Sequence, residues 1–64
     1  MLKINGKEYN YDGMTISEIL ELEHYEKFRV AVERNQEIIP KAQYDSVQVQ
    51  DQDQLEIVSF VGGG

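Results

Sequence analysis

The sequence predicts an α+β fold in which one helix packs on one face of a mixed four- to five-stranded sheet. Three observations predict this fold. Two short segments that alternate apolar and polar residues open the chain, on either side of a strong turn signal. A helix-capping motif with an apolar stripe follows, and the second half of the chain returns to short alternating segments that end in an apolar strand.

The opening segments predict a β-hairpin. Residues 2–4 and 7–11 alternate as half-buried strands do. Between them lies Asn5-Gly6, and both residue types accept the positive φ of a tight hairpin turn. Asp12-Gly13 then ends the second strand.

The helix is predicted from residue 16 to residue 23. Thr15-Ile16-Ser17-Glu18 has the form of a capping box, in which Thr15 and Glu18 each bond the other's backbone N–H. Ile16, Ile19 and Leu20 follow at helical spacing and form one apolar stripe. Residues 24–28 are expected to connect the helix to the next strand.

The second half predicts three more strands. Residues 29–34 and 37–39 flank a turn at Asn35-Gln36, residues 41–45 form one irregular or helical turn, and residues 54–61 form the last strand. A helix between the second and third strands, with a tail that leaves the last strand, matches the β-grasp or ubiquitin-like roll. Residues 1–61 are therefore predicted to be one β-grasp domain, and residues 62–64 a flexible glycine tail.

The predicted core lies between the helix and the sheet. It consists of apolar residues from every long element: Leu2, Ile4, Ile16, Ile19, Leu20, Val30, Val32, Leu55 and Ile57.

Composition excludes several classes of function. The chain has 64 residues, no cysteine and a net charge of −6. Nucleic acid is not an expected partner, because a phosphate backbone is bound by clustered cations. No segment is long and apolar enough for a membrane span, and a cytoplasmic location fits the absence of cysteine. His24 is the one histidine, so we expect a solvated surface residue and no metal site.

The last strand contains a candidate docking surface. Leu55, Ile57 and Ser59 share one face, so Val58 and Phe60 point away from the helix if the first two are core residues. Exposed apolar side chains beside the tail indicate partner docking. The alternative is that Phe60 packs under an edge loop or against Tyr9 or Tyr11.

Two further features have both a functional and a structural interpretation. The acidic run Glu18, Glu21, Glu23 and Glu26 is either a partner-docking face or, as we favour, a solvated helix surface. Gly62-Gly63-Gly64 is either an inert terminus or a tail that threads a narrow channel, in which case the reactive group is the carboxylate of Gly64.

Three stretches carry a resemblance to a known family: residues 2–7, residues 32–40 and residues 53–64. Together they resemble the sulfur carrier proteins of thiamine biosynthesis, which are small β-grasp proteins. The resemblance covers nearly the whole chain. That family ends in a Gly-Gly pair, whereas this chain has three glycines, so that Gly63-Gly64 corresponds to the pair and Gly62 is an additional residue.

The resemblance implies a carrier that is not itself an enzyme and has no catalytic residues or bound cofactor of its own. An adenylating enzyme uses ATP to activate the Gly64 carboxylate. A persulfide sulfur donor then converts it to a thiocarboxylate, and thiazole synthase takes the sulfur. The alternatives are the small subunit of molybdopterin synthase, which has the same ending, and a β-grasp interaction module with an inert tail.

Overall fold

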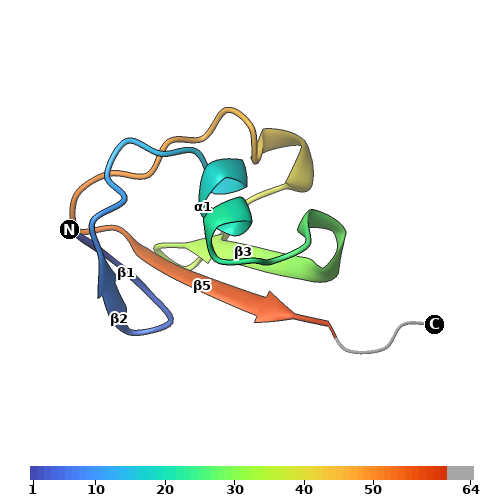
Figure 1. Cartoon of the computed structure of the whole chain (residues 1–64), viewed down its shortest axis with the longest axis horizontal. Coiled ribbons are helices and arrows are strands. Elements are labelled where there is room, and N and C mark those ends of the chain that lie inside the picture. Colours follow the sequence, from blue (N-terminus) through green and yellow to red (C-terminus); the bar gives the residue numbers. More distant parts are fainter. Residues whose placement is uncertain (61–64) are drawn as a thin grey trace.

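A computed structural model describes residues 1–60 as a five-stranded mixed sheet with one α-helix (Figure 1). The strand order is β2-β1-β5-β3-β4; β1 and β5 are parallel, and the other neighbouring pairs are antiparallel. The strands are β1 (Leu2–Ile4), β2 (Lys7–Tyr9), β3 (Val30–Arg34), β4 (Glu37–Ile38) and β5 (Gln54–Ser59). With α1 (Ile16–Leu22) over one face, the predicted α+β class and β-grasp connectivity are confirmed.

The predicted capping box starts α1. The Thr15 hydroxyl accepts from the Glu18 backbone N–H at 3.1 Å, and the Thr15 N–H donates to the Glu18 carboxylate at 2.8 Å. The helix ends at Leu22, one residue before the predicted end. There His24 takes a left-handed conformation with φ 63°, and the Tyr25 N–H donates to the Leu20 carbonyl oxygen at 2.8 Å. These features are those of a Schellman C-cap.

Four strands are shorter than predicted: β3 begins one residue later, β4 ends one residue earlier, and β2 and β5 also end earlier. β2 ends at Tyr9 because Tyr9 is paired with Leu2, the first residue of β1, so residues 10 and 11 have no strand beside them. β5 ends at Ser59 rather than at residue 61, which lies outside the described residues. The chain also contains two 3₁₀ turns. The first, η1 (Lys27–Arg29), lies between α1 and β3, and the second, η2 (Lys41–Gln43), lies between β4 and β5. The helical turn predicted after Pro40 is thus confirmed.

The hydrophobic core fills the space between α1 and the sheet. All nine predicted core residues are buried, and three more join them: Ile39, Tyr44 and Val49. All three lie in the long connection between β4 and β5, which folds back over α1 and closes the core on that side. The core is therefore completed by a loop as well as by regular elements.

No helix in residues 1–60 is long and apolar enough to cross a membrane, since α1 has seven residues.

Candidate functional site

β5 is the element that leads the chain toward its C-terminal residues. It lies in the centre of the sheet, between β1 and β3, and its last residue, Ser59, is paired with Val30. One residue further, the Phe60 N–H still donates to the Arg29 carbonyl oxygen at 2.8 Å. The backbone is thus held by the sheet as far as Phe60. The predicted reactive residue Gly64 and the tail residues Gly62 and Gly63 lie outside the described residues.

The two faces of β5 differ as the alternation predicts. Leu55 and Ile57 are buried against α1, whereas Val58 is 53% exposed and Phe60 is 58% exposed. Burial of Phe60 under a loop or against a tyrosine is therefore wrong. Tyr9 and Tyr11 stack instead on each other, with ring centroids 5.1 Å apart, and both pack against the core cluster.

Cross-strand pairing defines an apolar patch at the end of β5. Val58 lies directly opposite Ala31 of β3, which is half-buried. We call Ala31, Val58 and Phe60 the outer patch, because all three lie on the sheet face that α1 does not cover. Nearer the start of β5, Glu33 and Glu56 are paired directly across the same two strands. The outer face of the sheet is therefore apolar toward the tail and acidic away from it.

The acidic end of that face contains a shallow pocket. Its lining consists of residues from β3, β5 and the turn after β3: Glu33, Asn35, Gln36, Gln54 and Glu56.

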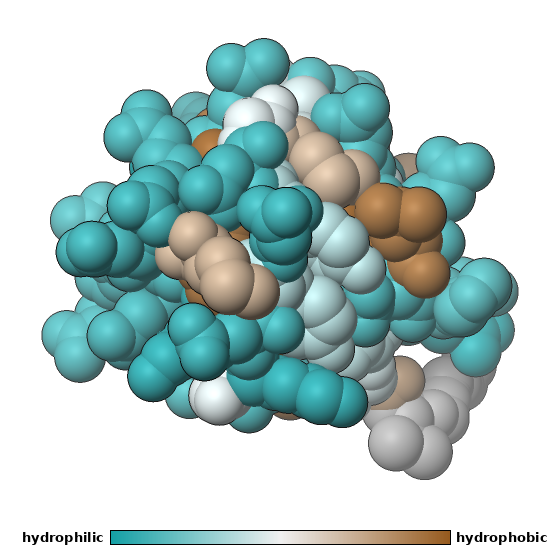
Figure 2. Space-filling view, turned by 60° about the vertical axis from the view of Figure 1, so that its left-hand side comes forward, coloured by the Kyte–Doolittle hydropathy of each residue, from teal (hydrophilic) through white to brown (hydrophobic). Residues whose placement is uncertain are grey.

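Figure 2 shows the molecule from the side of the β1–β2 hairpin, where the surface is mostly hydrophilic and the apolar residues lie in separate spots. On that side the apolar residues do not form one continuous patch.

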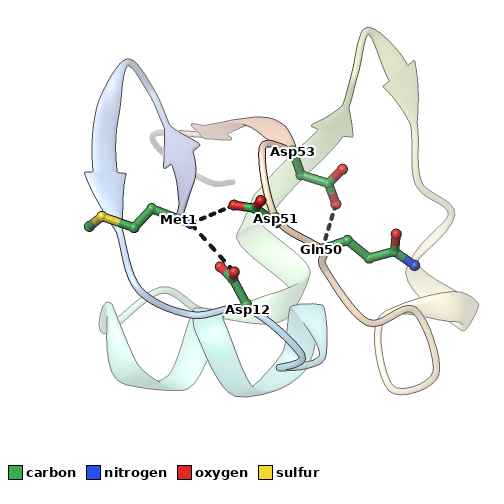
Figure 3. Close-up of polar contacts among 5 residues, drawn as sticks. All are labelled: Met1, Asp12, Gln50, Asp51 and Asp53. Carbon is green, nitrogen blue, oxygen red and sulfur yellow. Dashed lines mark hydrogen bonds and ion pairs between the residues drawn. The ribbon is translucent and has the colours of Figure 1, made fainter.

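Asp53 fixes the start of β5 through a buried polar network. Its carboxylate accepts from the Arg34 Nε at 2.8 Å, from the Asn35 side-chain amide at 3.1 Å and from the Gln50 backbone N–H at 2.8 Å. Figure 3 shows the contact with Gln50. The Asn35 side chain also accepts from the Gln54 backbone N–H at 3.0 Å. Arg34 and Asn35, which helped to carry the family resemblance, thus have a structural role here.

The same donors control the ionisation of the Asp53 carboxyl group. Asp53 is only 7% exposed. Burial alone would raise its pKa, because a carboxylate loses hydration in the interior. The bonds from Gln50, Asn35 and Arg34 outweigh burial and hold the pKa of Asp53 below its ordinary value. Asp53 is therefore a stable anion at neutral pH and not a proton-transfer group.

The α-amino group of Met1 lies in a second polar contact, on the surface (Figure 3). It is 2.6 Å from the Asp51 carboxylate and 3.4 Å from that of Asp12. The hydrogen bond to Asp51 raises the pKa of this amino group. Because all three groups are exposed, the contact joins the chain start to the turn before β5 without forming a catalytic site.

Asn5 holds β5 from the other side. Its side-chain oxygen accepts from the Ile57 N–H at 2.8 Å, and its side-chain nitrogen donates to the Ile57 carbonyl oxygen at 3.1 Å. Sequence analysis identified Asn5 only as a turn residue, because a turn signal gives no information about a strand 52 residues away. The part of β5 that precedes the outer patch is thus hydrogen-bonded by a turn side chain on each side, Asn5 and Asn35.

The remaining candidates have structural explanations. His24 is exposed in the helix C-cap, and residues 1–60 contain no group of three or more metal-ligating side chains in position to hold an ion. In the acidic run, Glu18 caps α1, Glu23 accepts from the Tyr11 hydroxyl at 2.6 Å and Glu26 pairs with Arg29 at 3.1 Å. Three of its four members therefore have partners within the chain.

Comparison with known proteins gives one consistent result. The sequence profile of the ThiS family matches residues 2–64. The chain is 47% identical over its full length to the whole of the sulfur carrier protein ThiS of Bacillus subtilis. It is 50% identical, over 98% of its length, to a thiazole synthase of Paramagnetospirillum magneticum, of which it spans only 20%.

Solved structures agree with the sequence comparison. The crystal structure of the thiamine biosynthesis protein ThiS of Geobacter metallireducens superposes with a TM-score of 0.77 at 31% identity, covering 98% of this chain and 97% of that one. Its solution structure gives a TM-score of 0.76 at 33% identity, covering 98% of this chain and 86% of that one. The resemblance found in the sequence is confirmed, and the chain belongs to the ThiS family.

Proposed function

We propose that this chain is a sulfur carrier of thiamine biosynthesis and that the C-terminal carboxylate of Gly64 carries the sulfur. The observation that supports this most directly is that the family profile extends to residue 64 and thus includes all three terminal glycines. The names of the relatives, a sulfur carrier and thiazole synthases, favour the thiamine pathway over molybdopterin synthase.

The proposed cycle has three steps. In the first, a carboxylate oxygen of Gly64 attacks the α-phosphorus of ATP on an adenylating enzyme, and pyrophosphate leaves. In the second, the terminal sulfur of a persulfide attacks the acyl carbon and AMP leaves; a thiol then reduces the acyl disulfide to the thiocarboxylate. In the third, thiazole synthase takes the sulfur: the bond between the sulfur and the acyl carbon breaks, an oxygen from the sulfur acceptor or from water bonds the acyl carbon in its place, and the carrier returns as a carboxylate.

The carrier contributes position rather than catalysis. A carboxylate becomes a usable electrophile only when its oxygen is converted to a leaving group, and the adenylating partner does this with ATP. Attachment to a docked protein holds the acyl group near the partner's reactive atoms and raises its effective concentration. The chain therefore needs neither a bound cofactor nor a metal. The use of ATP supports a cytoplasmic location.

The outer patch is the proposed docking surface for the adenylating enzyme. Val58 and Phe60 are exposed apolar side chains immediately before the residues that must enter the partner's active site. Truncation of a buried interface anchor commonly costs more than about 1 kcal/mol of binding free energy. Phe60→Ala should accordingly raise the dissociation constant for this enzyme and leave the melting temperature nearly unchanged.

Intact-mass spectrometry tests the carrier function. The chain is incubated with an adenylating enzyme, ATP and a persulfide donor, and the product is fragmented. The proposal requires a mass change of one oxygen-to-sulfur exchange that is localised to Gly64. An unmodified chain, under conditions in which a known carrier is modified, would favour the β-grasp interaction module with an inert tail.

Changes in tail length test whether the terminus itself reacts. Deletion of Gly64 still leaves a Gly-Gly ending, but it withdraws the carboxylate by about 3.5 Å. Misplacement by even 1 Å can cost on the order of 10²-fold in rate. We expect slower acyl-adenylate formation after this deletion, and a larger deficit when one alanine is appended after Gly64. Equal rates for the parent and both variants would exclude the terminus as the reacting group.

A further inference from the structure

The 3₁₀ turn η1 lies at the end of the molecule where β5 delivers the chain to its C-terminal residues (Figure 1). The carbonyl oxygen of Arg29, the last residue of η1, accepts from the Phe60 N–H at 2.8 Å. The next residue, Val30, is paired with Ser59. η1 therefore adjoins the outer patch through the backbone of the sheet.

Phe28, in the middle of η1, is 80% exposed, which is the highest exposure among the large apolar side chains of residues 1–60. It takes no part in the core cluster. Exposure of a phenyl ring on this scale forgoes a burial free energy of roughly 2–3 kcal/mol. Phe28 and Phe60 thus place two exposed aromatic rings at the tail end of the molecule.

The same end holds half of the chain's cations. Lys27 and Lys41 place their ammonium groups 6.0 and 5.7 Å from the centroid of the Tyr44 ring, and Arg29 is the last residue of η1, directly before β3. Within residues 1–60, two carboxylates pair with this cluster: Glu26 with Arg29, and Asp45 with Lys27 at 3.8 Å. Because the whole chain carries −6, the tail end has the opposite local sign from the rest of the surface.

The pair between Arg29 and Glu26 is readily exchanged. The side chains of Arg29 and Glu26 are 69% and 73% exposed, and an exposed pair contributes little to stability. Arg29 can therefore leave Glu26 for a carboxylate of another protein at small cost. Lys41 is held more firmly, because its ammonium group donates to the Val30 carbonyl oxygen at 2.6 Å.

On the basis of the proposed function, we propose that η1 is a second docking element for the adenylating enzyme. Phe28 enters an apolar pocket of that enzyme, and Arg29 pairs with a carboxylate at the rim of this pocket. The outer patch and η1 together then surround the point at which the tail leaves the domain. The partner that fits has two apolar pockets beside the mouth of its tail channel, with acidic residues between them.

Charge favours the ATP-using enzyme as the occupant. Adenylation requires a protein of charge −6 to bring its terminal carboxylate to a bound nucleoside triphosphate, so that long-range repulsion opposes the approach. A cationic cluster at the tail end turns that end toward the anionic site. Oriented encounter of this kind affects the association rate and depends on salt.

Steady-state adenylation kinetics with the enzyme of the same organism test the aromatic anchor. The variant is Phe28→Ala, and its control is Ile38→Ala, which truncates a side chain that is 74% exposed on β4, an edge strand paired with β3 at the end distant from Ser59. We expect Phe28→Ala to raise KM about 10- to 30-fold with an unchanged kcat. We expect Ile38→Ala to match the parent. Both variants should melt like the parent, because neither side chain belongs to the core.

A pair of charge reversals tests the cationic contact. Arg29→Glu and Lys7→Glu change the net charge equally, but Lys7 lies in β2, at the sheet edge opposite β4. We expect Arg29→Glu to raise KM by at least 10-fold at low salt and to reduce the salt dependence of kcat/KM, whereas Lys7→Glu should do neither. Thiocarboxylate formation by the parent is measured alongside these rates.

The outcomes separate the two proposals. If the parent is not adenylated, the proposed function is wrong. If the parent is active but Phe28→Ala has the KM of the parent, or if Ile38→Ala raises KM as much as Phe28→Ala does, the docking role of η1 is overturned while the carrier function stands. Equal effects of Arg29→Glu and Lys7→Glu would overturn the local charge contact in the same way.

Discussion

The two hairpin turns of the sheet, Asn5-Gly6 and Asn35-Gln36, both bond the central strand through an asparagine, but they differ in their second residue. Each turn begins with an asparagine in the left-handed region, with φ 52° at Asn5 and φ 51° at Asn35. Each asparagine also bonds the backbone of β5: Asn5 at Ile57 and Asn35 at Gln54. The first residues of the two turns therefore form hydrogen bonds to the central strand from opposite sides.

The difference lies in the second residue of each turn. Gly6, with φ 84°, takes the left-handed conformation without strain, whereas Gln36 takes φ 73° with a side chain attached. The Asn35 turn is also joined to Asp53 and Arg34, whereas within residues 1–60 no carboxylate bonds the Asn5 side chain. A strained turn is thus tied to a buried polar network, and an unstrained turn has only its own amide.

The largest expected effect comes from removing the network. Asp53→Ala leaves the Arg34 guanidinium, the Asn35 amide and the Gln50 N–H without their shared acceptor. We expect the free energy of unfolding to fall by about 2–4 kcal/mol, because part-buried donors lose their partner. Urea denaturation measures this loss. A change below 0.5 kcal/mol would mean that water replaces the carboxylate fully, and that the network does not hold the strained turn.

Replacing each asparagine by glycine separates the contribution of its side-chain hydrogen bonds from that of the left-handed turn conformation. Glycine keeps the left-handed φ but lacks the amide, so Asn5→Gly removes only the two bonds to Ile57. We expect a loss of about 1–2 kcal/mol. Asn35→Gly also removes two bonds, but it should cost more, because one of them is a charge-assisted bond to the Asp53 carboxylate. Thermal melts of both variants give the comparison, and the reverse order of stabilities would contradict it.

Acid should weaken the Asn35 side of the sheet before the Asn5 side. The folded pKa of Asp53 is lowered, so its stabilising contribution is present above its unfolded pKa of about 3.9 and is lost as pH falls through the folded value. We expect the stability difference between the parent and Asp53→Asn to stay constant from pH 7 to about pH 4 and to shrink as the pH falls further. Hydrogen exchange should show Gln54 losing protection in acid before Ile57. A difference independent of pH would mean that Asp53 acts only by its shape.

How much the sequence predicts depends on the range of each interaction. The hairpin turn, the capping box, the helix and the alternating faces of β5 are local patterns, and Asn5-Gly6, Thr15 and Val58 lie as predicted. The exposed side of Phe60 also follows from alternation, once Leu55 and Ile57 are assigned to the core.

The features that sequence analysis missed all depend on tertiary contacts. Tyr44 and Val49 are buried because a long loop returns over α1, and nothing in their local sequence marks them as core. The local sequence around Asp53 does not indicate its network either, because its three donors come from residues 34, 35 and 50. The exposure of Phe28 likewise depends on how η1 meets β3. Patterns of three or four residues carry no information about such contacts.

The smallest expected effect tests the strain itself. Gln36→Gly should relieve the left-handed conformation at that position and raise the stability, but the added freedom of the unfolded chain offsets part of the gain, so the net change should be below about 1 kcal/mol. Gly6→Ala should act in the opposite direction by about 1 kcal/mol, because the space around Gly6 is open and only its φ of +84° opposes a side chain. Differential scanning calorimetry on both variants measures the two small shifts. Destabilisation by Gln36→Gly would show that the Gln36 side chain stabilises this turn through contacts of its own, in which case the two turns differ in their side-chain contacts rather than in strain.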